Sequence, residues 1–385
     1  MPSTIRTVRS AAALALLAGL VAPAMAQYTT PNVINTSNPI TTSLNGTQFT
    51  NYGLVGVGRI SASMLDAQGS TFGSVSSLAI SPGSWQYNAA TGQFSGQFLT
   101  LPDRGRNDPV NNVYVNYQAR IQQLGFTFTP SYNGSGASQN QIQFNYQGLT
   151  MLTESNGQPL VGMDPGTGVG TAFGRPVPRV GGPNGNLAID AEGLVATPDG
   201  GYYVSDEYGS AIYRFNAGGV LQGVINPPEA LMPRNNGALD FNSATAPQQG
   251  RRNNQGMEGL SLSPDGRYLF AMNQSGAMQD SAGSNQANRR FTRVMVYDLQ
   301  NNPIPTDPIG QYVVELPTTN VNGNGSAVNR TAAASEIVAI SDTQFMILSR
   351  DSNGRGPSTG LPPVFRSVLL ADISARRTCR EPTSR

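Results

Sequence analysis

The sequence contains no lysine, no histidine and a single cysteine, and each shortage rules out a kind of chemistry. All 24 basic residues are arginines. Without histidine there is no Ser-His-Asp triad and no His-ligated zinc site, and without lysine there is no P-loop lysine. One cysteine, Cys379, excludes an internal disulfide and a multi-cysteine metal site.

Charge is also scarce, since charged residues make up only 12% of the chain. Once the two terminal segments described below are set aside, 18 arginines face 22 acidic residues, a net charge of −4. A mildly acidic body argues against nucleic-acid binding. Glycine (44 residues) and proline (27 residues) are plentiful instead, which favours many short strands and turns over helices. The composition therefore predicts an all-β protein.

The chain divides into four segments. Residues 1–26 predict a secretory signal peptide, with Arg6 and Arg9 before an apolar run and a small-x-small cleavage site that ends at Ala26. No other run is long enough to span a membrane, so we expect an exported bacterial protein, periplasmic or secreted. Residues 27–52 form a Thr- and Asn-rich lead-in that we expect to be extended, residues 53–374 form the folded domain, and residues 375–385 form an Arg-rich tail.

One motif of strand, turn and strand recurs along the domain. Its second copy, "DAEGLVATPDGGYYVSDEYG", begins at Asp190, and its third, "GMEGLSLSPDGRYLFAMNQSG", begins at Gly256. Further copies begin at Ser74 and Ala334. Repeated antiparallel hairpins, each followed by outer-strand patterns, predict a β-propeller of four-stranded antiparallel blades. A β-sandwich with chance similarity between the copies is the alternative.

Acidic residues lie at the open ends of these hairpins. A two-residue turn at Asp199-Gly200 would place Glu192 directly opposite Glu207, where like charges destabilise a sheet. The same reasoning pairs Glu258 with Asn273, and a looser turn in the last copy would pair Glu336 with Asp351. In the first copy Asp103 occupies the closing position. In a propeller these ends would meet at one mouth of the central channel.

Such a ring of acids needs positive charge. A hard cation such as Ca²⁺ takes carboxylate and amide oxygens and needs neither His nor Cys. We therefore predict bound Ca²⁺, with these metal ligands: Asp103, Glu192, Glu207, Glu258, Glu336 and Asp351. Arginines beside the same motifs, Arg104, Arg252 and Arg350, would bind a substrate anion. The alternative is that the acids only tie blades together by hydrogen bonds.

These motifs, together with "LTLPDRG", resemble the phytase-like family, described as having esterase-like activity of phytase. The resemblance covers roughly Gly53 to Ser374 and implies an exported bacterial propeller that hydrolyses phosphoesters. β-Propeller phytases carry several calcium ions and phosphate-binding lysines in the channel, whereas this chain has no lysine. Members of the family continue past the "LLADIS" strand, but here "ARRTCREPTSR" follows. We therefore expect a propeller that is incomplete at its C-terminus, and we interpret the tail as a frameshift; a natural basic tail is the alternative.

The function expected from the sequence is metal-assisted hydrolysis of a small phosphoester or other ester at the channel mouth. Glu192 and Glu258 are the candidate catalytic residues, as metal ligands or general base. Two alternatives stay open: a non-catalytic propeller that binds a ligand or partner at the same mouth, and a calcium-dependent lactonase-like hydrolase.

Overall fold

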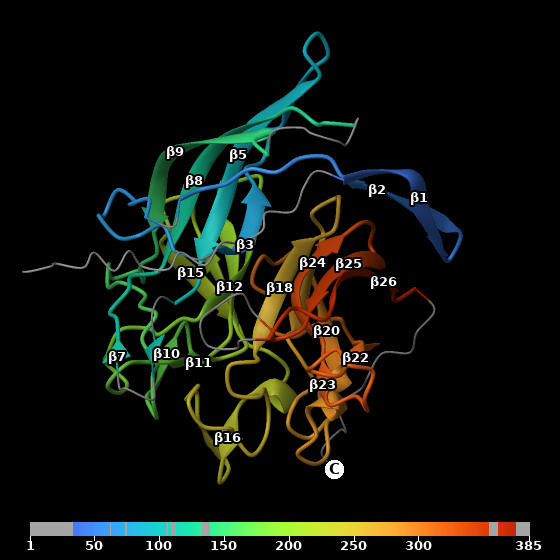
Figure 1. Ribbon diagram of the computed structural model, residues 1–385. Coiled ribbons are helices and arrows are strands. Elements are labelled where there is room, and N and C mark those ends of the chain that lie inside the picture. Colours follow the sequence, from blue (N-terminus) through green and yellow to red (C-terminus); the bar gives the residue numbers. More distant parts are fainter. Residues whose placement is uncertain are drawn as a thin grey trace, which may run out of the picture. The chain divides into compact units, whose positions relative to one another are not determined.

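The strands assemble into four antiparallel sheets that follow one another along the sequence and form a four-bladed β-propeller (Figure 1). The computed structural model describes residues 34–61, 63–73, 75–104, 107–108, 113–132, 139–353 and 361–374. All of these residues belong to one compact unit, Asn32–Arg385. The predicted signal peptide and the Arg-rich tail lie outside the described residues.

Each of the first three blades has a path of four strands that runs from its innermost strand outwards. In blade 1 the strand β4 (Gln86–Asn88) also pairs with the second strand of the path. Blade 1 comprises β3 (Val75–Ile80), β5 (Gln93–Pro102), β8 (Arg120–Phe128) and β9 (Ile142–Met151). Blade 2 comprises β12 (Ala191–Ala196), β13 (Tyr202–Asp206), β14 (Ile212–Phe215) and β15 (Leu221–Ile225). Blade 3 comprises β18 (Met257–Leu262), β19 (Tyr268–Asn273), β20 (Phe291–Asp298) and β21 (Gly310–Glu315).

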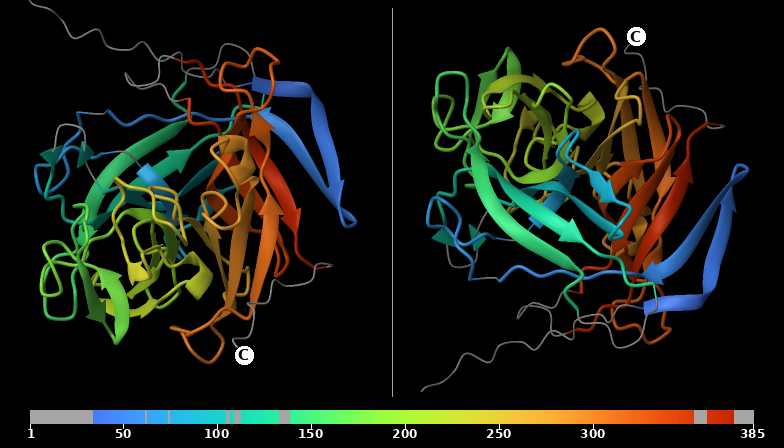
Figure 2. Two further views of the ribbon diagram at one scale, coloured as in Figure 1. Left: turned by 90° about the horizontal axis from the view of Figure 1, so that it is seen from below. Right: turned by 90° about the horizontal axis from the view of Figure 1, so that it is seen from above.

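Blade 4 has three strands among the described residues: β24 (Ala333–Ala339), β25 (Gln344–Arg350) and β26 (Arg366–Asp372). The innermost strands are neighbours in space, with β12 beside β3, β18 beside β12, and β24 beside β18. Figure 2 shows the sheets from below and from above, following one another in sequence order around the propeller. The all-β propeller predicted from the sequence is thus confirmed.

Burial differs between strands that are covered on both faces and strands with one face in solvent. All five residues of β13 are buried, because both of its faces are covered by neighbouring blades. The outermost strand β9 alternates between partly buried and exposed positions over most of its length, as expected of a strand with one face in solvent.

The hydrophobic core consists of three clusters, each between consecutive blades. Leu101 and Ile121 of blade 1 meet Val204 and Tyr213 of blade 2. The second cluster joins blades 2 and 3, and the third joins blades 3 and 4, where the rings of Phe270 and Phe345 lie 5.9 Å apart. Burial of these faces against one another supplies the main driving force for stacking the blades.

Smaller elements lie in the connections between the large strands. The lead-in contains the hairpin β1 (Ile34–Leu44) and β2 (Thr47–Leu54). The other short elements are β6 (Asn107–Asp108), β7 (Val113–Tyr114), β10 (Val169–Ala172), β11 (Arg175–Pro178), β16 (Arg234–Asn235), β17 (Ala238–Leu239), β22 (Thr318–Thr319), β23 (Arg330–Thr331), and the 3₁₀ helices η1 (Glu229–Leu231) and η2 (Gln286–Arg290). Within the described part of the chain, no helix is both long and apolar enough to cross a bilayer.

Candidate functional site

The innermost strand of every blade carries a β-bulge near its start. The register shifts between Val75 and Ser77 in β3, and at the corresponding places in β12, β18 and β24. A bulge adds an unpaired residue and redirects its side chain. The residues at these four equivalent positions are Ser76, Glu192, Glu258 and Ser335.

The bulges and the turns change the cross-strand pairs expected from the sequence. In blade 2 the loop holds three residues, with Thr197 N bonded to Gly201 O at 2.9 Å and Gly200 at φ 81°. The structure therefore pairs Ala191 with Asp206, and the predicted Glu192–Glu207 pair is wrong. A three-residue loop that ends in a left-handed glycine is a standard hairpin closure, and it shifts the register by one residue relative to a two-residue turn.

The other two predicted pairs also fail. In blade 3 the expected register holds from Gly259 to Leu262, but the bulge then places Met257 opposite Asn273 where Glu258 was expected. In blade 4 Glu336 lies opposite Leu348 and not opposite Asp351. Glu336 therefore stands one position beyond the bulge, where Gly259 stands in blade 3.

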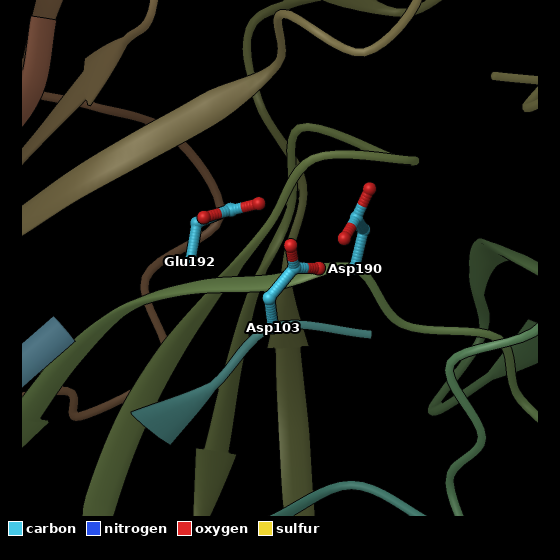
Figure 3. A group of neighbouring side chains, drawn as sticks. All are labelled: Asp103, Asp190 and Glu192. Atoms are coloured by element: carbon cyan, nitrogen blue, oxygen red, sulfur yellow. The ribbon is translucent and has the colours of Figure 1, made fainter. Parts of the chain in front are cut away.

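Three carboxylates nevertheless converge at the open ends of blades 1 and 2. Asp103 follows β5, Asp190 precedes β12, and Glu192 lies in the β12 bulge. One oxygen from each lies within 4.8 Å of the others, and Figure 3 shows the three carboxyl groups facing a common space. We name these three residues together with Glu207 and Glu258 the carboxylate site.

Glu258 and Glu207 extend the group toward blade 3. The side chains of Glu192 and Glu258 are hydrogen-bonded to each other. Glu207 follows β13, is 1% exposed, and neither of its carboxylate oxygens has a hydrogen-bond partner. A buried carboxylate without donors is costly unless a cation compensates it.

Burial dominates the electrostatics of the site. It raises the pKa of Glu207 to about 8, with a further contribution from the charge of Glu192. Burial also raises the pKa of Glu192, to which Glu258 adds, and the pKa of Asp190, which Arg104 only partly offsets. The pKa values of Glu207, Glu192 and Asp190 rise because both the low-polarity surroundings and the neighbouring acids disfavour the charged form.

Three guanidinium groups accompany the acids. Arg104 Nη1 lies 2.8 Å from Asp190 Oδ2, and Arg104 also donates to Asn254 Oδ1 at 2.6 Å. Arg350, the last residue of β25, offsets part of the rise in the Glu258 pKa that burial and Glu207 cause. Arg251 is fully buried, and its charge lowers the pKa of Glu207.

Arg251 is a residue that sequence reasoning missed. It donates to the carbonyl oxygens of Tyr208 (2.9 Å) and Phe241 (2.7 Å) beneath the carboxylate site. Its neighbour Arg252, predicted to bind a substrate anion, instead donates to Gly276 O at 3.1 Å and to Ser281. The pair "RR" was the only signal, and a loop leaves open which of two adjacent side chains points inward.

Two predicted metal ligands have other partners. Asp351 Oδ2 accepts hydrogen bonds from the backbone of Phe365, at 2.8 Å, and of Val364. Glu336 Oε1 accepts from Leu260 N at 3.1 Å, and Oε2 accepts from Ser77 Oγ. Glu336 thus ties blade 4 to blades 1 and 3, as in the alternative that some acids only tie blades together, whereas Asp351 bonds within blade 4 and its Oδ1 has no hydrogen-bond partner.

Equivalent positions on the second strands complete a pattern with fourfold repetition. In each blade, the residue before the bulge pairs with a residue of the second strand. The position meant here is the next residue along that second strand. The four residues are Asp103, Glu207, Gln274 and Arg350. Blades 1 and 2 therefore contribute acids, blade 3 an amide that donates to Glu258, and blade 4 a cation.

The residues present fit a single hard divalent cation. The five carboxylates and the three guanidiniums leave two negative charges when all are ionised. The buried atoms without protein partners include both oxygens of Glu207 and both side-chain polar atoms of Asn273, which ends β19 and is 1% exposed. Oxygen donors of this kind suit Ca²⁺.

The fold and the carboxylate site together define a class, an all-β propeller with acids gathered at the open ends of its inner hairpins. The family model described as "Phytase-like: Esterase-like activity of phytase" matches residues 71–380. The chain belongs to this family. The family membership expected from the motifs is confirmed, while the activity in the family's description is not thereby shown for this chain.

One curated relative is an uncharacterized secreted protein of Arthroderma benhamiae. It is 33% identical over 358 residues, which cover 85% of this chain and 68% of the relative. This relative comes from a fungus, so it gives no support to the expectation of a bacterial source. Its name specifies no substrate and no cofactor.

Solved structures give only distant likenesses. An ancestral GH74 enzyme matches with 14% identity and a TM-score of 0.30, over 89% of this chain and 32% of the enzyme. The PQQ-bound aldose sugar dehydrogenase of Streptomyces coelicolor matches with 11% identity and a TM-score of 0.30, over 89% of this chain and 96% of the enzyme. Likenesses at this level bear on neither the site nor the function.

Proposed function

We propose that this chain is an exported hydrolase of small phosphoesters or other esters that works with Ca²⁺ at the carboxylate site. The observation that carries the proposal is Glu207, a buried acid among other buried acids. Neither of the two carboxylate oxygens of Glu207 has a protein donor. A fold seldom retains such a group without a function, because replacing it with apolar residues would stabilise the protein.

Asp103, Asp190 and Glu192 would hold the cation, since their oxygens already lie within 4.8 Å of one another. A cation bound there would polarise the ester oxygen and acidify a water molecule. Glu207, buried next to Glu192, would complete the negative surroundings that retain the ion. Glu336 is left out of this ligand set because protein donors occupy both of its oxygens, and Asp351 because its Oδ2 is bonded to the backbone of its own blade.

Glu258 is the residue that would accept a proton from the attacking water. It is hydrogen-bonded to Glu192 and receives a hydrogen bond from Gln274 Nε2, so its carboxyl group is held in place beside the predicted ligands. A fixed carboxylate beside the reacting water is the arrangement that general base catalysis requires.

The substrate anion would be bound by arginine. Arg350 is exposed and lies on blade 4. Of the four equivalent second-strand residues, Arg350 is the one that carries a positive charge. Arg104 is 17% exposed and reaches the site through Asp190. Guanidinium groups suit phosphate and carboxylate oxygens, so both phosphoesters and carboxylic esters fit this arrangement. Arg252 has no part in it, because its donors are bonded to residues 276–281.

Export is supported by the secreted relative and by the signal-like residues 1–26. The mature chain would then encounter Ca²⁺ outside the cytoplasm. It would need no internal disulfide there.

Turnover assays test the proposal. The protein would be stripped of metal and assayed with p-nitrophenyl phosphate, bis-p-nitrophenyl phosphate, p-nitrophenyl acetate and a lactone, with and without Ca²⁺. We expect Ca²⁺-dependent turnover that is lost in Glu258→Gln and kept in Glu315→Gln, a control at a residue with a 60% exposed side chain. Tight Ca²⁺ binding without turnover of any substrate would instead identify a non-catalytic binding module.

A further inference from the structure

Three arginines gather in the connections around blades 3 and 4. Arg252 lies in the loop before β18, Arg289 lies in η2, and Arg330 lies in β23. We name these three residues the arginine cluster. Within the described part of the chain, no ion pair joins any of them to a carboxylate.

Hydrogen bonds bring Arg252 and Arg289 to the same turn. Arg252 Nε donates to Gly276 O at 3.1 Å, and Gly276 N donates to Arg289 O at 2.7 Å. The guanidinium of Arg289 donates through Nη1 to Gln255 Oε1 at 3.3 Å, and the backbone of Gln255 pairs with that of Arg252. The two side chains are therefore fixed near each other by the protein.

Arg330 joins the other two through a contact between β23 and η2. Thr331 Oγ1, next along the chain, donates to Gln286 O at 2.9 Å. Burial and then the charge of Arg330 lower the pKa of Arg289, and burial and then the charge of Arg289 lower the pKa of Arg252. Each charge is thus close enough to repel the next, and no described carboxylate offsets the repulsion.

Other arginines of blade 3 do have a counter-ion. Arg290, the neighbour of Arg289, lies 3.3 Å from Glu315, and Arg293 lies 2.8 Å from Asp280. Like charges that are held together and partly removed from water destabilise a fold unless an opposite charge compensates them. The arginine cluster therefore lacks an anion that its neighbours possess.

Arg289 and Arg330 keep donors that a ligand could use. Both are half-buried, and among the described residues the side chain of Arg289 donates only to Gln255, while that of Arg330 donates only to Asn329 O, at 3.1 Å. A guanidinium has five N–H groups in a planar fork that matches two oxygens of a phosphate. Gln255 Oε1 also accepts from Ser275 Oγ at 2.8 Å, which leaves Gln255 Nε2 as a further donor.

We infer that Arg289 and Arg330 bind the oxygens of a phosphate group, and that the charge of the buried Arg252 adds to theirs. A phosphate offers several acceptor oxygens and supplies the negative charge that the arginine cluster lacks. The site is separate from the carboxylate site and from Arg350. It requires neither Ca²⁺ nor turnover, so it does not depend on the proposed function.

Calorimetric titration of the metal-stripped protein with inorganic phosphate tests this inference. We expect binding that weakens as NaCl is added, because salt screens the charges. Arg289→Gln and Arg330→Gln should each weaken it about tenfold or more, since each removes a charged donor. Arg175→Gln is the matched control and should leave the affinity unchanged. Arg175 is half-buried, belongs to β11 and has no ion pair with a described carboxylate.

Two further variants decide where the phosphate binds. Arg289→Lys keeps the charge but loses the planar fork, so its affinity should fall between those of the wild type and Arg289→Gln. Arg350→Gln should bind phosphate as the wild type does, and circular dichroism would confirm that each variant is folded. Loss of binding in Arg350→Gln but not in Arg289→Gln would place the phosphate at the carboxylate site and overturn the inference. A wild type that binds no phosphate would also overturn it.

A second titration distinguishes two sources of the phosphate group. Glucose 6-phosphate carries the same group on a neutral small molecule. Binding tighter than that of inorganic phosphate, and dependent on Arg289, would identify a phosphorylated small molecule as the ligand. Weaker binding with the same dependence would identify free phosphate.

Discussion

Ser77 of blade 1 donates a hydrogen bond to Glu336 of blade 4, a contact between residues 259 positions apart in the chain. Ser77 Oγ also accepts from Leu194 N of blade 2 at 3.0 Å, and Glu336 accepts from Leu260 N of blade 3 at 3.1 Å. Two side chains thus connect the innermost strands of all four blades. Glu336 therefore connects blade 4 to blades 1 and 3, and both of its oxygens accept hydrogen bonds from the protein.

Removal of this carboxylate should destabilise the propeller. Glu336→Ala leaves Leu260 N and Ser77 without their acceptor at a partly buried site, so we expect the free energy of unfolding to fall by about 2 kcal/mol. Urea denaturation followed by circular dichroism measures this change. Glu315→Ala, at a side chain that is 60% exposed, should change stability by about 0.5 kcal/mol or less. Equal effects of the two substitutions would contradict the role assigned to Glu336.

Without a cation, stability should fall as the pH rises. Burial raises the pKa of Glu207 from 4.5 to about 8, so the folded state binds more protons than the unfolded state between these values. The stabilising contribution of the protonated group is complete below pH 4.5 and is lost as the pH passes through about 8. In a chelator, the melting temperature should therefore be lower at pH 8 than at pH 5.

Ca²⁺ and a substitution separate this effect from other titrations. Added Ca²⁺ should raise the melting temperature most at pH 8, where the carboxylates are ionised. Glu207→Gln should make the profile in chelator flatter. A melting temperature in chelator that rises from pH 5 to pH 8 would show that Glu207 is not a buried, uncompensated acid.

Glu192→Gln should weaken Ca²⁺ binding. The substitution keeps the shape of the side chain but removes a charge from the group Asp103, Asp190 and Glu192. Even residues that only support metal ligands change affinity by about tenfold or more, so we expect at least that loss in calorimetric titration. Glu315→Gln provides the matched control. An unchanged affinity in Glu192→Gln would remove this residue from the ligand set.

Phe173→Asn should stabilise the protein. Phe173 and Gly174 form the two-residue turn between β10 and β11, with φ angles of 50° and 72°. A bulky residue is strained in this left-handed conformation, whereas Asn-Gly is favoured in such turns. Phe173 is 54% exposed, so little buried surface is lost. We expect a gain of about 1 kcal/mol in urea denaturation. Phe173→Ala, which lacks the Asn preference, should show no such gain.

The sequence was sufficient to predict the architecture because its signals are local. Asp-Gly turns, alternating strands and the repeated copies each depend on neighbouring residues, and they led to the propeller and to the gathering of Asp103, Glu192 and Glu258. The register was harder to predict. The loop after Thr197 has three residues and the loop after Ser263 has four, although both contain Pro-Asp-Gly.

The bulges explain most of the remaining errors. A bulge adds one residue to a strand without disturbing the alternating pattern on either side, so the pattern does not reveal it. Glu336 matches Glu192 and Glu258 in the motif, yet the structure gives that position to Ser335. Which of Arg251 and Arg252 faces the acids depends on the path of a loop, and no local signal encodes that path.

The four bulged positions also bear on how such a protein can change. The residue at each of these positions lies outside the regular pairing of the two strands. Serine occupies two of the positions and glutamate occupies the other two. A point mutation at one blade can therefore alter the polarity around the axis while the sheets keep their alignment. Divergence toward a different ligand would need only a few such replacements, with the scaffold left as it is.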